Sequence, residues 1–123
     1  MSKRILVVDD SAANRLALRL ELLDRGFAVE EAGDGKAAIA LLKAGGFDAV
    51  VTDVWMPEAD GIAVVRAMQQ DQPELPVFVI TGGGPGLSIA SASALAEVWG
   101  AEKVYVKPFD VRVLVDELAA RLG

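Results

Sequence analysis

The chain has 123 residues, 53% of them hydrophobic, and a formal net charge of −6 at pH 7. Its length suits one domain, since domains most often have about 100–150 residues, and its acidic balance argues against binding the nucleic-acid backbone, which needs a basic face. Because the sequence has no cysteine and no histidine, it excludes disulfides, thiolate or imidazole metal ligands, and histidine acid–base chemistry within the chain.

Apolar runs of strand length alternate with helical patterns along the chain, which is typical of β-α-β units and a parallel sheet. We expect the strands at about 4–8, 27–31, 48–52, 77–80 and 103–106. We expect helices at about 12–25, 35–44, 61–70 and 87–98, and a fifth helix that follows Asp110 as its N-cap. The sequence shows no linker and no second domain, so residues 1–123 are expected to form one domain.

Two of the helices have an informative apolar spacing. The helix at 12–25 has the spacing of an amphipathic helix through Ala13, Leu16, Leu20 and Leu23. The helix after Asp110 has the clearest period in the chain, through Val111, Leu114, Val115, Leu118 and Leu122.

The composition of the strands predicts their order in the sheet. The first, third and fourth runs are almost purely apolar, as expected of strands that are buried on both faces. The second run, with Glu30 and Glu31, and the fifth run, with Lys103, are mixed and suit the edges of a sheet. An α/β sheet of order 2-1-3-4-5 places these two runs at its edges and puts strands one and three side by side.

Neither a signal peptide nor a membrane span is expected. The basic start of the chain leads straight into a short strand. Residues 75–96 carry no charge and reach the roughly 20 residues that a spanning helix needs, but Pro76 and the glycine-rich run 82–86 interrupt them. We therefore expect a cytoplasmic, soluble chain.

Four of the expected strands are followed directly by residues that carry a charge or a hydroxyl: Asp9, Asp10, Asp53, Thr81 and Lys107. Ligands of open α/β sheets bind in the crevice outside the carboxyl ends of the strands, so we expect these five side chains to meet there. A ligand set made only of oxygen favours magnesium or manganese. A lysine beside such a metal suits a phosphoryl group.

Each of these residues also has a purely structural interpretation, which needs no functional site. The acidic pair at 9–10 would serve equally well as the N-cap of the following helix, although Ser11 could also fill that role. Lys107 alone would be an ordinary surface lysine, and Thr81 an ordinary β-branched strand residue. Asp53 is the sharpest candidate, because an ionised carboxylate at the end of a buried strand is costly unless something pairs with it.

Four segments in this order resemble the receiver domain of bacterial two-component response regulators: Ile-Leu-Val-Val-Asp-Asp at 5–10, Asp-Val-Trp-Met-Pro-Glu-Ala-Asp-Gly at 53–61, Thr81-Gly82, and Lys107-Pro108-Phe109. The resemblance covers essentially the whole chain and is to the stand-alone, chemotaxis-regulator-like type. It implies a flavodoxin-like (βα)5 fold, a three-layer sandwich around a parallel five-stranded sheet of order 2-1-3-4-5. It also implies a proline at 108 whose peptide bond is often cis.

The resemblance implies a role for each site residue. Asp53 would accept a phosphoryl group from a phosphohistidine of a sensor histidine kinase or a histidine phosphotransfer protein. A magnesium site, or a manganese site, would be formed by Asp9, Asp10, Asp53 and the backbone carbonyl of Trp55. The phosphoryl oxygens would be held by Lys107, Thr81 and the Gly82 N–H.

The resemblance further implies a signalling module and not an enzyme that acts on other molecules. The chain would catalyse only its own aspartyl phosphorylation and dephosphorylation. A downstream protein target, or a second copy of the chain, would bind a surface made of the fourth helix, the fifth strand and the fifth helix. Nucleic acid and membranes are not expected as partners.

The sequence departs from the family pattern at one position. The family usually has Tyr or Phe three residues before the lysine, where the aromatic side chain couples to the switch hydroxyl. Here that position is Val104, and the aromatic residue is Tyr105, one position later. Because side chains alternate along a strand, Tyr105 is expected to face the other way, and the switch is expected to work without an aromatic rotamer flip.

Two other functions compete with the phosphoacceptor. One is a magnesium-dependent phosphatase that hydrolyses a small substrate through an aspartyl phosphate, but Trp55 stands where such an enzyme usually has a second acid–base carboxylate. The other is a pseudo-receiver that only docks partners, against which the intact acidic set argues.

Overall fold

The computed structural model describes residues 2–53, 66–68, 70–81, 94 and 100–123. Its strands are β1 (Arg4–Val8), β2 (Ala28–Ala32), β3 (Ala49–Asp53), β4 (Val77–Thr81) and β5 (Lys103–Val106). Its helices are α1 (Ala12–Asp24), α2 (Gly35–Ala44) and α5 (Val111–Leu122). Residues 66–68 and 70–71 are also helical, in keeping with the helix expected at 61–70, whose first residues lie outside the described ones, as does nearly all of the helix expected at 87–98.

The sheet has the predicted order, β2-β1-β3-β4-β5, and all its neighbouring strands are parallel. Three strands, β2, β3 and β4, end one residue later than the sequence suggested, so Asp53 is the last residue of β3 and Thr81 the last residue of β4. Every residue of β3 and β4 is buried, whereas β2 and β5 at the edges are partly exposed. The polar residues at 53 and 81 are therefore fixed by the sheet itself.

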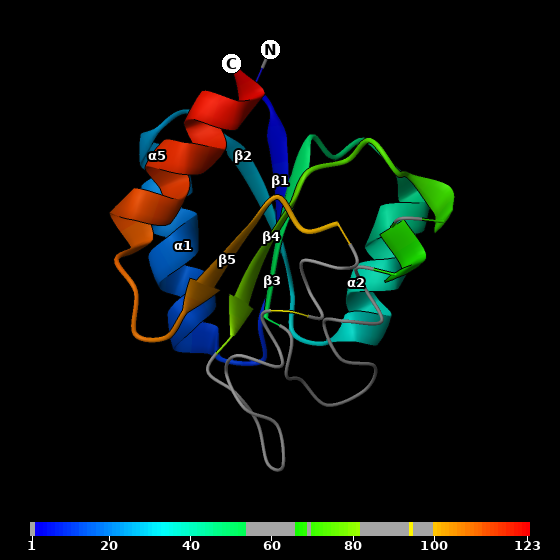
Figure 1. Cartoon of the computed structure of the whole chain (residues 1–123), viewed down its shortest axis with the longest axis horizontal. Coiled ribbons are helices and arrows are strands. Elements are labelled where there is room, and N and C mark those ends of the chain that lie inside the picture. Colours follow the sequence, from blue (N-terminus) through cyan, green and yellow to red (C-terminus); the bar gives the residue numbers. More distant parts are fainter. Residues whose placement is uncertain (1, 54–65, 69, 82–93, 95–99) are drawn as a thin grey trace.

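The molecule has three layers, with α1 and α5 on one face of the sheet and α2 on the other (Figure 1). Alternate residues of each strand supply the two halves of the core. On one face, Ile5, Val7 and Phe78 pack with leucines of α1 and α5. On the other, Leu6, Val50 and Val79 pack with Ala38 and Leu42 of α2. This is the flavodoxin-like sandwich that was expected.

The buried face of α1 differs from the expected one. Leu18 and Leu22 are buried, whereas Leu16, Leu20 and Leu23 are 54%, 58% and 44% exposed. The helix has leucines on two faces, so their spacing alone could not decide between them. The decision comes from tertiary packing, because α1 packs against both the sheet and the neighbouring helix α5, and the face of Leu18 and Leu22 meets both.

Arg4 of β1 connects its strand to β2 and to the segment between α2 and β3. Its guanidinium donates to the backbone carbonyls of Gly45 and Gly46, forms an ion pair with Glu30 of β2, and lies 4.6 Å above the ring of Phe47. Both ends of the chain lie at this side of the molecule, opposite the carboxyl ends of the strands (Figure 1).

The two faces of β5 separate Val104 from Tyr105, as the sequence predicted. Val104 packs against the core half beneath α2, whereas Tyr105 packs against the half beneath α1 and α5. The Tyr105 hydroxyl donates to Glu117 Oε1 over 2.7 Å, and its ring centroid lies 5.9 Å from that of Phe109. Tyr105 thus joins β5 to α5.

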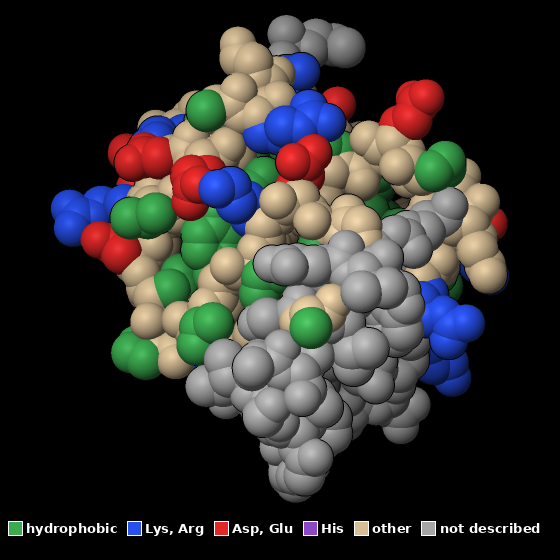
Figure 2. All heavy atoms as spheres, viewed as in Figure 1, with side chains coloured by type: hydrophobic (Ala, Val, Ile, Leu, Met, Phe, Trp, Pro, Cys, Tyr) green, Lys and Arg blue, Asp and Glu red, His purple; other side chains and the backbone are tan. Residues whose placement is uncertain are grey.

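Acidic and basic side chains are intermingled over α5 and β5 (Figure 2). Two ion pairs account for part of this pattern, Lys103 with Glu117 at 2.9 Å and Arg121 with Glu102 at 2.7 Å. Such exposed pairs contribute little to stability. Within the described residues, no helix has the length and apolar character needed to cross a membrane.

Candidate functional site

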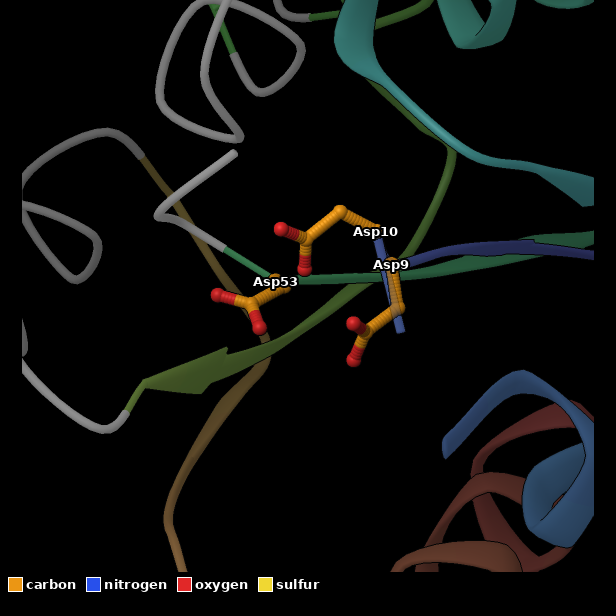
Figure 3. Close-up of side chains that lie close together, drawn as sticks. All are labelled: Asp9, Asp10 and Asp53. Atoms are coloured by element: carbon orange, nitrogen blue, oxygen red, sulfur yellow. The ribbon is translucent and has the colours of Figure 1, made fainter. Parts of the chain in front are cut away.

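Three carboxylates converge at the carboxyl ends of β1 and β3. The two strands are neighbours, and Val8 pairs with Thr52, so Asp9 and Asp53 follow at the same level of the sheet. Figure 3 shows the side chains of Asp9, Asp10 and Asp53 turned toward one space. One oxygen of each lies within 4.8 Å of the others. Asp9 and Asp53 are 0% and 3% exposed, whereas Asp10 is exposed.

Asp9 is held on both of its carboxylate oxygens. Oδ1 accepts a hydrogen bond from the backbone N–H of Ser11 at 2.8 Å, and Oδ2 accepts one from Asn14 Nδ2 at 3.4 Å. Burial raises the pKa of Asp9; the Ser11 hydrogen bond opposes this shift, and the nearby charge of Asp53 adds to it. Two crowded carboxylates of this kind favour a cation between them.

The N-cap of α1 is Ser11, whose side chain accepts a hydrogen bond from the backbone N–H of Asn14. The cap interpretation of the acidic pair is therefore wrong: the helix is capped without Asp9 or Asp10. Both acidic residues can therefore contribute their carboxylates to the crevice.

Lys107 supplies the positive charge of the site. Its Nζ lies 2.6 Å from Asp53 Oδ2 and 3.8 Å from Asp9 Oδ2. Partial burial opposes its charged form, but the hydrogen bond to Asp53 and the charges of the three carboxylates outweigh that effect and raise the pKa of Lys107. Its backbone N–H donates to the carbonyl of Thr81 at 2.9 Å, and the peptide bond to Pro108 is cis.

The remaining predicted site residues have different outcomes. Thr81 is fully buried at the end of β4, the strand next to Asp53. By strand alternation it shares a sheet face with Val79 and Val104. Trp55 and Gly82 lie outside the described residues, so the roles expected of them remain predictions.

The residues present fit a hard divalent cation. Three carboxyl groups and one ammonium give the crevice a formal charge of −2, and the carboxyl groups offer only oxygen as a ligand atom. Such a donor set is the one that magnesium and manganese prefer. Because Asp10 is exposed, a cation could keep some of its waters there.

Two contributors at the start of α1 were not found by sequence reasoning. Asn14 donates to Asp9, and Arg15 Nη1 donates to the backbone carbonyl of Asp9 at 2.6 Å. The only signal was their position in the first turn of the helix that follows the acidic pair. A groove of about 560 Å³ opens beside Asn14, between α1 and the β5–α5 connection, with Asp9 and Lys107 at its polar end.

Comparison with known families and structures agrees with this geometry. The model of the response regulator receiver domain matches residues 5–119. The chain is 38% identical over 122 residues to response regulator MprA of Mycolicibacterium vanbaalenii, with 99% of this chain and 51% of that protein covered. The chain thus spans about half the length of the curated relatives it matches.

Solved structures match along nearly the whole chain. Chemotaxis protein CheY4 of Vibrio cholerae has a TM-score of 0.84 at 30% identity, covering 98% of each chain. TrrA of Thermotoga maritima, solved with Mg(2+)-BeF, has a TM-score of 0.82 at 28% identity, covering 98% of this chain and 99% of its own. A receiver domain protein of Methanospirillum hungatei has a TM-score of 0.89 at 24% identity, with 99% of this chain and 94% of that chain covered, and supports the fold alone.

Proposed function

The chain belongs to the response regulator receiver domain family, whose members accept phosphoryl groups in two-component signalling, and we propose that Asp53 is the residue that accepts the phosphoryl group in this chain. The observation that carries this assignment is the position of Asp53. It ends a buried central strand, its Oδ2 contacts Lys107, and two further carboxylates share its crevice.

The transfer needs little covalent chemistry from the protein. A carboxylate oxygen of Asp53 attacks the phosphorus of a phosphohistidine on a partner, the P–N bond breaks, and the electron pair leaves with the imidazole nitrogen. In dephosphorylation, water attacks the same phosphorus and the P–O bond to Asp53 breaks. Because residues 1–123 contain no histidine, the phosphohistidine lies outside this domain. Catalysis of such a transfer is mainly positioning and stabilisation of charge.

The other site residues supply that positioning. Asp9 and Asp10, with Asp53 and the carbonyl of Trp55, would hold magnesium, or manganese in its place. The metal would neutralise charge on the phosphoryl oxygens. Lys107 is already beside Asp53, and a short movement would take its ammonium onto a phosphoryl oxygen. Thr81 and the Gly82 N–H would complete the set of donors.

Phosphorylation would switch the binding of partners. The donor, a sensor histidine kinase or a histidine phosphotransfer protein in the cytoplasm, would approach over the groove beside Asp9 and Lys107. The output would leave through the surface of the fourth helix, β5 and α5, toward a protein target or a second copy. Of this surface, the described residues include β5 and α5. The chain would act on no substrate other than its own aspartyl phosphate.

We further propose that the receiver domain occupies residues 1–123 and is of the chemotaxis-regulator-like type. The support is the agreement with CheY4 along 98% of both chains, whereas the MprA relatives are about twice as long. Limited proteolysis tests the bounds of the domain: a stable fragment much shorter than residues 1–123 would contradict them.

The phosphorylation site is tested with a small phosphodonor. The protein is incubated with acetyl phosphate and Mg²⁺ and weighed by mass spectrometry. We expect one phosphate on the wild-type protein, none on Asp53→Asn, and one on the matched control Asp24→Asn, which removes an exposed carboxylate on α1. An adduct that persists in Asp53→Asn would overturn the assignment, and multiple turnover of a generic phosphomonoester would favour the phosphatase.

A further inference from the structure

One side chain, that of Arg15, links the turn that carries Asp9 and Asp10 to strand β2. Arg15, in the first turn of α1, donates from Nη1 to the backbone carbonyl of Asp9 at 2.6 Å. The same guanidinium donates from Nε to Glu31 of β2 at 3.1 Å. Arg15 therefore connects three elements: the end of β1, the start of α1 and the end of β2.

The contact at the Asp9 carbonyl bears directly on Asp10. That carbonyl belongs to the peptide group that joins Asp9 to Asp10, so a donor fixed on its oxygen fixes the plane of the peptide. The Asp9 side chain has its own hydrogen bonds to Ser11 and Asn14. The Asp10 side chain is exposed, and its direction depends on the backbone that Arg15 holds. A hydrogen bond from a charged guanidinium is stronger than a neutral one.

Glu31 keeps Arg15 in place. It accepts from Arg15 on Oε1 and from Arg19 Nη1 on Oε2, both at 3.1 Å. The side chains of Arg15 and Glu31 are 21% and 28% exposed, whereas that of Arg19 is 50% exposed. Arg19 shares the ion pair with Glu31 and is the same residue type on the same helix, but the Asp9 carbonyl is contacted by Arg15.

We infer that Arg15 is a positioning residue for the metal-binding carboxylates, acting through the peptide group of Asp9 and Asp10 and anchored by Glu31. This inference rests on the proposed function, because the acidic crevice must bind a divalent cation for the position of Asp10 to matter. Residues that hydrogen-bond to metal ligands and so orient them typically change the metal affinity by about 10–100-fold when they are removed.

The sign of the effect separates positioning from simple electrostatics. Replacing an arginine near the carboxylates by a neutral residue removes positive charge, which by Coulomb's law alone strengthens the binding of a cation. Loss of positioning weakens it. Arg15→Gln is therefore expected to bind magnesium more weakly, and Arg19→Gln, which removes the same unit of charge, to bind it as the wild type does or slightly more tightly.

The experiment is a magnesium titration of the full chain, by calorimetry, for the wild type, Arg15→Gln, Arg15→Lys and Arg19→Gln. We expect Arg15→Gln to raise the magnesium Kd by about 10-fold and Arg15→Lys, which keeps the charge but not the two-sided fork, to fall between it and the wild type. Equal effects of Arg15→Gln and Arg19→Gln, tighter binding by Arg15→Gln, or full recovery by Arg15→Lys would each overturn the positioning role.

A second readout needs no metal. In metal-free buffer, amide hydrogen exchange of Ser11, whose N–H donates to Asp9 Oδ1, reports the order of the turn. We expect faster exchange in Arg15→Gln and unchanged exchange in Arg19→Gln. Unchanged exchange in Arg15→Gln overturns the inference even if the metal site fails. A wild-type protein that binds no magnesium contradicts the proposed metal site, which separates the two failures.

Discussion

Lys107 Nζ lies 2.6 Å from Asp53 Oδ2, although 54 positions separate the two residues in the chain. Asp53 ends β3 and Lys107 follows β5, and these two strands are not neighbours, because β4 lies between them. Lysine has the length to cross the end of β4, and the backbone N–H of Lys107 is held there by the Thr81 carbonyl. The unphosphorylated site therefore already holds the Lys107 ammonium beside the Asp53 carboxylate. There it would neutralise negative charge on a phosphoryl group.

The energetic coupling of this pair is the first prediction. Lys107→Met removes the ammonium from a buried carboxylate and should lower the free energy of unfolding by about 1–2 kcal/mol, less than for a fully buried pair because the lysine side chain is about a third exposed. In an Asp53→Asn background the same substitution should cost much less. Urea unfolding of the four proteins in metal-free buffer measures this cycle, and an equal loss in both backgrounds would contradict the coupling.

Magnesium should stabilise the folded chain by mass action. At a concentration 100 times its Kd, a ligand that binds only the native state adds about 2.7 kcal/mol to the free energy of unfolding. We expect a magnesium-dependent rise in melting temperature that Asp10→Asn largely removes, since Asp10 is one of the three clustered carboxylates. Asp24→Asn, an equal change of charge at an exposed position of α1, should keep the rise. Equal responses of the two variants would place the metal elsewhere.

The two leucine faces of α1 should differ sharply in their effect on stability. Leu22 is 0% exposed and packs in the core beneath α5, whereas Leu20 is 58% exposed. Leu22→Ala should lower the free energy of unfolding by about 2–5 kcal/mol, and Leu20→Ala by no more than about 0.5 kcal/mol. Chemical denaturation measures both. A large loss in Leu20→Ala would show that the face predicted from leucine spacing is the buried one.

The phenol of Tyr105 should ionise only at strongly alkaline pH. Burial, and then the hydrogen bond to Glu117, raise the pKa of Tyr105 above its ordinary value of 10.0. Stability that depends on the protonated phenol is fully present below pH 10 and is lost as the pH rises through the raised pKa. Because Tyr105 is the only tyrosine in the sequence, phenolate absorbance follows it directly.

Glu117→Gln provides the control for this titration. It removes the carboxylate charge and should lower the pKa of Tyr105, but not to the ordinary value, because burial is the larger cause. Circular dichroism recorded in parallel shows whether the fold persists. An ordinary tyrosine titration in a folded wild-type protein would contradict the position of the hydroxyl.

The acidic crevice could be predicted from the sequence because it depends on topology. Once the apolar runs indicate parallel strands in the order 2-1-3-4-5, the residues that end them must meet at one edge. The packing of Lys107 against Asp53, and the separation of Val104 from Tyr105, follow from the same rule and from strand alternation.

Features that depend on tertiary contact could not be predicted in this way. Leu16 and Leu18 are equally apolar, and only the packing of α1 against the sheet and α5 decides which of them is buried. Arginine is a common surface residue, so its type alone does not mark Arg15. The contact of Arg15 with the Asp9 carbonyl depends on the angle at which α1 leaves β1. In both cases the deciding partner is distant in the chain or belongs to the backbone, where residue type carries no signal.

The position of the chain ends at the amino edge of the sheet, away from the carboxylates, has a practical consequence (Figure 1). Fluorescent proteins or surface tags attached to either end would leave the reactive edge facing outward, so an immobilised sensor should keep its full access to phosphodonors. Domains whose termini lie at the surface often tolerate circular permutation. A permutant with joined ends could open its new ends beside the acidic crevice, which would convert a charge change there into an optical signal.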